Sequence, residues 1–65
     1  MATRHTVGDV VTSRVDNGKI KVGDVGIVVH FANYPGEEYP WTVETEDGRK
    51  EAFNGFELAK ENEDV

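Results

Sequence analysis

The chain has 65 residues, 37% of them hydrophobic, and its thirteen Asp and Glu against seven Lys and Arg give a formal net charge of −6. This length allows one domain with one small core, and the absence of cysteine excludes disulfides, thiolate metal sites and thiol chemistry. The acidic balance disfavours nucleic acid as a partner, because it repels a phosphate backbone.

The first residues lack the pattern of a signal peptide, and no apolar run approaches the roughly 20 residues of a membrane span. We therefore expect a cytoplasmic protein without membrane contact. Residues 1–6 are polar and are expected to form a flexible arm, followed by one domain at residues 7–60 and an acidic tail at residues 61–65.

The tetrapeptide Val-Gly-Asp-Val occurs at residues 7–10 and again at residues 22–25, each time as a tight turn directly before β-branched residues. The first copy predicts a strand at residues 10–15, which ends at the turn signal of residues 16–18. That turn either closes a tight hairpin with residues 19–22 or forms the tip of a longer irregular loop. The second Gly-Asp pair favours the longer loop.

Residues 25–31 are the most hydrophobic stretch and predict the central strand. Their nearly continuous apolar run is typical of a strand that is covered on much of both faces. Gly26 inside it indicates a bulge or a close backbone approach that would bend the strand. The Pro-Gly dipeptide in residues 32–38 then predicts a loop.

Residues 41–45 alternate large or β-branched with polar side chains, which predicts a third strand with Trp41 and Val43 facing inward. The Asp-Gly turn of residues 46–49 joins it to a fourth strand at residues 50–53 in a hairpin.

Asn54 and Gly55 break the fourth strand, and a single helical turn is expected to follow and to insert Phe56 into the core. Residues 57–60 predict a short closing strand. No long helix is expected, because no segment has a period of 3.6 residues.

Five short strands with a long first loop, a tight hairpin between strands three and four and one short 3-10 turn before the last strand predict an all-β, five-stranded SH3-like barrel. The stretches at residues 24–29, 38–43, 52–53 and 56–58 carry a more specific similarity. They resemble the family of the small extrinsic stromal subunit of photosystem I, and the variable chain of ferredoxin-thioredoxin reductase is similar. The resemblance implies the barrel fold and an accessory, non-catalytic role.

No residue pattern indicates catalysis, a metal site or a cofactor. The two histidines are far apart, with His5 in the expected arm and His30 in a strand, where a surface or partly packed side chain is expected. The glycines fit no phosphate-binding pattern, and the carboxylates lack the spacing of a calcium loop. We therefore expect a protein that is not an enzyme.

Two surfaces are candidates for binding. Exposed aromatic and acidic side chains around the loop after the central strand predict a contact with a protein partner, since Tyr is enriched at interfaces; these residues are Tyr34, Pro35, Glu37, Glu38 and Tyr39. A small basic patch is the alternative and would suit a KOW-like nucleic-acid module; its residues are Arg14, Lys19, Lys21, Arg49 and Lys50. A structural subunit that stabilises a catalytic chain is a further alternative to the protein-binding or accessory module that we favour.

Overall fold

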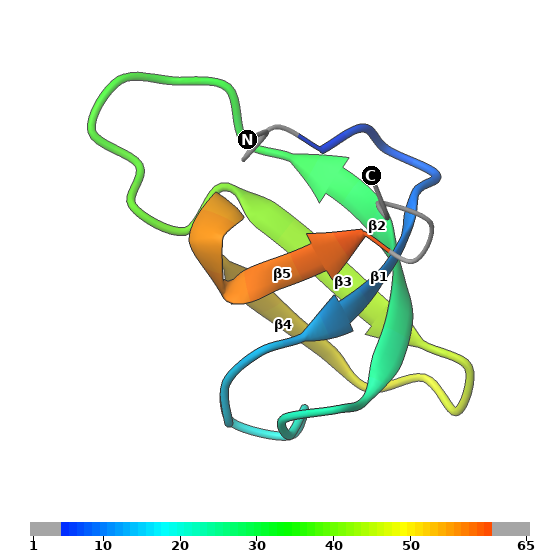
Figure 1. Ribbon diagram of the computed structural model, residues 1–65. Helices are drawn as coiled ribbons and strands as arrows, with labels where there is room; N and C mark the ends of the chain where they lie inside the picture. The colour runs from blue at the N-terminus through cyan, green and yellow to red at the C-terminus, as the bar shows by residue number, and fades with distance from the viewer. Residues whose placement is uncertain (1–4, 61–65) are drawn as a thin grey trace.

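The computed structural model describes residues 5–60, which form one antiparallel sheet with a single 3-10 turn. The elements, in chain order, are β1 (Val10–Ser13), β2 (Val25–Phe31), β3 (Trp41–Thr45), β4 (Lys50–Phe53), η1 (Gly55–Glu57) and β5 (Leu58–Lys60). The strands lie in the order β4-β3-β2-β1-β5 (Figure 1). The all-β class, the five strands and the turn before the last strand are confirmed. The sheet keeps β4 and β5 as its edges and is not closed into a barrel.

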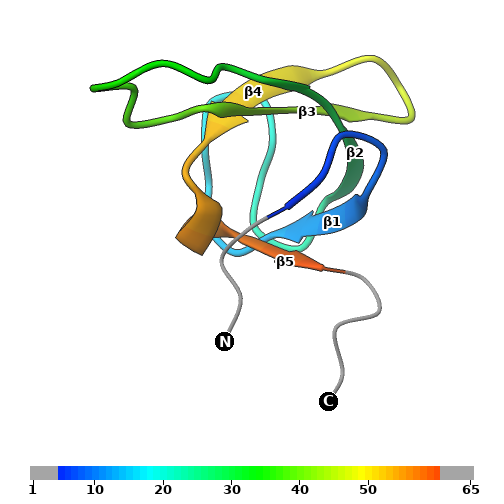
Figure 2. The ribbon, with the colours of Figure 1, turned by 90° about the horizontal axis from the view of Figure 1, so that it is seen from above.

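The sheet bends at β2, so that β3 and β4 lie opposite β1 and β5 (Figure 2). The core fills the space between these two halves, and it consists of Val11, Ile20, Val28, Trp41, Val43, Phe53 and Leu58. Trp41 and Val43 are buried, as the alternation in β3 predicts. Ile20 is the core residue that comes from no strand, because the long loop between β1 and β2 carries it into the open side of the sheet.

The two Val-Gly-Asp turns have the same local structure. Gly8 and Gly23 both have positive φ, at 102° and 92°, which is the conformation of the third residue of a type II turn. In each turn the aspartate carboxylate accepts a backbone N–H from three residues earlier, over 2.9 Å: Asp9 from Thr6, and Asp24 from Lys21. Each copy therefore fixes the direction in which the chain enters the following strand.

The connection between β1 and β2 is the longer irregular loop that the second Gly-Asp pair favours. Its tip is nonetheless tight, because the backbones of Asn17 and Ile20 exchange both hydrogen bonds across Gly18. The predicted first strand is two residues too long. It ends at Ser13, whose hydroxyl donates to the carbonyl of Val15 and turns the chain away from the sheet.

His5, which lies within the predicted arm of residues 1–6, is packed against the core. His5 is 4% exposed, its Nε2 lies 3.0 Å from the carbonyl oxygen of Gly55, and its ring meets Trp41 edge-on at 5.4 Å. A polar residue near a chain end is expected in solvent, but this histidine covers one end of the core. Residues 1–4 of the arm and the predicted tail at residues 61–65 lie outside the described residues.

The prediction that Phe56 fills the core is also wrong, because this side chain is 75% exposed. The reason is the capping box at the start of η1. The Asn54 side chain accepts the N–H groups of Phe56 and Glu57, while the Glu57 carboxylate accepts the N–H of Asn54. This reciprocal capping sets the turn so that Leu58 enters the core instead.

Candidate functional site

The two histidines lie in different places, one packed in the fold and one on the surface of β2. His5 is packed on Trp41, and the side chain of His30 is exposed on β2, as expected for that residue. Within residues 5–60, no group of three or more metal-ligating side chains is placed to hold a metal ion. No helix in the same residues is long and apolar enough to cross a membrane.

The loop between β2 and β3 projects away from the sheet (Figure 1) and is organised by one carboxylate. Glu37 accepts the Tyr34 hydroxyl at 2.7 Å through Oε1 and the Tyr39 backbone N–H at 2.9 Å through Oε2. The hydrogen bond from Tyr34 lowers the pKa of Glu37, and the same bond raises the pKa of Tyr34. Tyr34 is 61% exposed and is therefore displayed in a defined position rather than folded into the core.

The predicted basic patch is divided by acidic partners. The Arg49 guanidinium donates to Asp47 at 3.0 Å, to Asp24 at 2.9 Å and to the backbone carbonyl of Lys19 at 2.9 Å. The Lys19 backbone N–H is bound in turn by the carboxylate of Glu51. The fold thus brings Lys19 and Arg49 into direct contact, but the Arg49 guanidinium is paired with two carboxylates and fastens the long loop to the β3-β4 hairpin.

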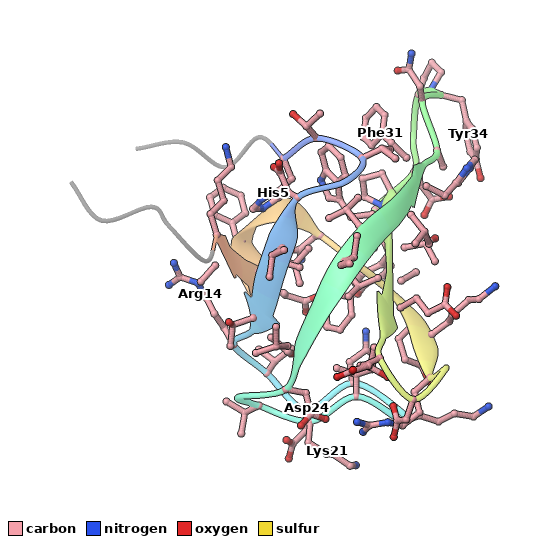
Figure 3. All side chains as sticks on the ribbon, turned by 90° about the vertical axis from the view of Figure 1, so that its right-hand side faces the viewer. His5, Arg14, Lys21, Asp24, Phe31 and Tyr34 are labelled. Carbon is pink, nitrogen blue, oxygen red and sulfur yellow. The ribbon has the colours of Figure 1, made fainter. Side chains whose placement is uncertain are left out.

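The remaining basic side chains do not extend this cluster into one face. Arg14 follows β1, Lys21 lies near the end of the long loop, and the two point in different directions (Figure 3). Lys50 is the partner of Glu44 in the register of β3 and β4. A nucleic-acid backbone would therefore meet carboxylates beside the positive charges.

The Arg49 ion pairs make stability depend on pH. The Lys21 N–H and then the Arg49 guanidinium hold the pKa of Asp24 below its usual value, and the Thr45 hydroxyl and then Arg49 do the same for Asp47. A carboxyl with a lowered pKa in the folded state stabilises it above the unfolded-state pKa and ceases to do so as pH falls through the folded-state pKa. We therefore expect the thermal midpoint to fall below about pH 4.

The matching variant is Arg49→Gln. Its midpoint should lie below that of the wild type near pH 7, and the two curves should converge as the pH falls through the lowered folded-state pKa values of Asp24 and Asp47, because both aspartates then become protonated in both proteins. Thermal melts followed by circular dichroism from neutral to acid pH measure this. Lys50→Gln removes a neighbouring charge that makes no ion pair within residues 5–60. The pH dependence of its thermal midpoint should therefore be the same as that of the wild type. A constant offset for Arg49→Gln at every pH would contradict the role of the ion pairs.

The outer face of β2 exposes a row of aliphatic side chains. Val25, Ile27 and Val29 alternate with the buried Gly26 and Val28. Val10 of β1 is the register partner of Ile27 and extends the row sideways. These four aliphatic side chains are 40–49% exposed. Figure 3 looks onto this face, with β2 running in front from Asp24 to Phe31.

Carboxylates border this aliphatic row on the side of β3. Glu44 is the register partner of Ile27, and Glu46 follows β3 and lines the same shallow groove as Val25. Neither carboxylate has an ion-pair partner within residues 5–60. We call the groove between Val10, Val25, Ile27 and Val29 and these two glutamates the β2 groove.

Comparison with protein-family models, with curated proteins and with solved structures gives no match for this chain. The candidate site therefore rests on the geometry of the chain itself.

Sequence reasoning missed the β2 groove. The apolar run of residues 25–31 predicts a strand covered on much of both faces, but residues 5–60 cover only the inner face. The bulge at Val29, where the register shifts between Val28 and His30, affects the end of the strand. Plain alternation would put Phe31 on the outer face, and the bulge returns it to the inner side against Trp41, with ring centroids 4.2 Å apart. The apolar run of residues 25–31 did indicate that both faces of the strand are apolar. The prediction that the chain covers much of both faces was wrong for residues 5–60.

Proposed function

We propose that the chain is a non-catalytic accessory module of the SH3-like barrel type that docks on a larger protein through the β2 groove. The observation that carries this proposal is the mismatch in β2, whose sequence is that of a strand covered on both faces and whose outer face has no cover within residues 5–60. A partner protein would supply the missing layer.

The contiguity of the exposed side chains supports docking. Single exposed aliphatic residues are ordinary on protein surfaces, whereas a contiguous row with a polar rim is typical of an interaction site. Val10 and Ile27 are direct cross-strand partners, and Val25 lies two residues from Ile27 on the same face. Covering all four aliphatic side chains would remove apolar surface from water at no cost to the fold.

The loop of residues 32–39 supplies a second point of contact in this proposal. Glu37 holds Tyr34 in place before any partner arrives, and an aromatic side chain ordered in advance loses less entropy on binding. The predicted contact residues Tyr34, Pro35, Glu37, Glu38 and Tyr39 keep this role as a proposal. The nucleic-acid alternative has less support, because Arg49, the central cation of the basic patch, is already paired with Asp24 and Asp47.

The test is co-purification of partners by the full chain from its native source. In the double variant Val25→Thr and Ile27→Thr, both positions stay β-branched but become polar, so the fold should persist while a partner that needs the apolar row is lost. Val22→Thr is the matched control, because it makes the same change at an exposed residue of the long loop.

Retention of the same partners by the double variant, with an unchanged melt, would contradict docking through the β2 groove. If the retained material is nucleic acid and its binding falls steeply with salt, the KOW-like alternative replaces the proposal. A partner that proves to be a catalytic chain, lost from the double variant alone, would identify the module as a stabilising subunit.

A further inference from the structure

We infer that the β2 groove takes a cationic amphipathic helix, with apolar side chains on the Val10, Val25, Ile27 and Val29 row and Lys or Arg side chains beside Glu44 and Glu46. This inference rests on the proposed docking function and adds the chemistry of the partner segment.

Strand pairing argues for a helix. β2 is hydrogen-bonded to β1 on one side and to β3 on the other, so the groove offers side chains and no free strand edge. An added strand would leave its own backbone N–H and C=O groups unpaired on this face. A helix satisfies its backbone internally and presents an apolar stripe, as in other helix-in-groove complexes. The row from Val25 to Val29 is about 13 Å long, which matches two to three helical turns.

Charge selects a basic helix. Glu44 borders Ile27 and Glu46 borders the groove near Val25, and both carboxylates are without an ion-pair partner within residues 5–60. The rest of the chain adds to this field, since its formal net charge is −6. Lys or Arg side chains flanking an apolar stripe would complement both the rim and the wider field.

The same charge argues against a second copy of this chain as the occupant. Self-association through the β2 groove would bring the glutamate rim against another chain with the same net charge of −6. The like charges of two copies repel each other at long range, which opposes that encounter. The same negative field attracts a cationic partner. The basic residue nearest in register, Lys50, faces Glu44 of its own chain.

The experiment titrates two synthetic peptides of about twelve residues into the full chain, followed by NMR chemical shifts and by calorimetry. Both peptides carry the same Leu stripe at helical spacing. One has Lys at the flanking positions and the other has Glu there. We expect the Lys peptide to bind with shifts centred on the four aliphatic residues, and the Glu peptide to bind at least about tenfold more weakly, because it exchanges attraction for repulsion at two sites.

Variants of the chain locate the charge effect. Glu46→Gln should weaken binding of the Lys peptide roughly two- to fivefold, which is the range of one exposed ion pair. Asp16→Asn removes the same charge from the long loop between β1 and β2, where the amide oxygen of asparagine can still accept the Val22 N–H, and should leave affinity nearly unchanged. The double variant Val25→Thr and Ile27→Thr should abolish binding of both peptides.

Three results would overturn the inference. Equal binding of the two peptides at the β2 groove would leave the docking function standing but remove the preference for a cation. Equal loss in Asp16→Asn and Glu46→Gln would show attraction to the net charge and not to this rim. If neither peptide binds and sedimentation shows a dimer that the double variant dissolves, the occupant is a second copy.

Discussion

Replacing Phe53 by alanine is expected to unfold the chain at room temperature. Phe53 is fully buried where β4 meets β3, and its register partner is Trp41. Truncating a buried phenylalanine costs about 3–5 kcal/mol, from lost apolar burial and from the cavity that remains. A domain of this size has a net stability of only a few kcal/mol, so the loss is comparable with the whole.

Circular dichroism and a one-dimensional NMR spectrum would show the loss of the sheet and of dispersed signals. Phe53→Leu is the matched control, because it keeps most of the apolar volume; it should stay folded with a lower midpoint. A cooperative melt of Phe53→Ala near the wild-type midpoint would mean that the core lies elsewhere than between the two halves of the sheet.

The elements that the sequence predicts correctly are those set by neighbours in the chain. β2, β3 and β4 begin and end where their patterns indicate, because alternation and the Asp-Gly turn are local signals. Ile20 and His5 are different, because their burial depends on what lies across the fold: a loop closing the sheet for Ile20 and a tryptophan ring for His5. The exposure of Phe56 has a local cause, the capping box of Asn54 and Glu57, whose spacing is present in the sequence.

The candidate site divides in the same way. The exposure of Tyr34 follows from its place in a polar loop with a Pro-Gly turn, and the structure adds only the Glu37 contact that orders it. The β2 groove depends on a non-local fact, namely that no second layer of the described chain covers the outer face. A continuous apolar run indicates that both faces of a strand are apolar and favour burial. It does not indicate whether the same chain packs against both faces.

Replacing Gly26 by alanine should also destabilise the chain strongly, although the same change at an ordinary strand position stabilises a protein. Gly26 is buried opposite Thr45, and an added Cβ would lie 2.6 Å from Val43 Cγ1 and 2.9 Å from the Glu44 carbonyl oxygen. The second contact is with backbone, which cannot rotate away. Overpacking of this kind costs about 1–3 kcal/mol, against about 0.4–1 kcal/mol gained by restricting the unfolded chain.

The thermal midpoints of Gly26→Ala and Gly26→Val distinguish the steric clash from an effect of strand propensity. Propensity alone ranks valine above alanine above glycine in a strand, whereas the clash predicts the reverse order of stability. Thermal melts should show Gly26→Ala about 5–15 °C below the wild type and Gly26→Val unfolded or lower still. A rise in the thermal midpoint from glycine to valine would mean that β2 and β3 do not come close together at Gly26. The close contact of the two strands would then not be what holds Val25 and Ile27 beside Glu44.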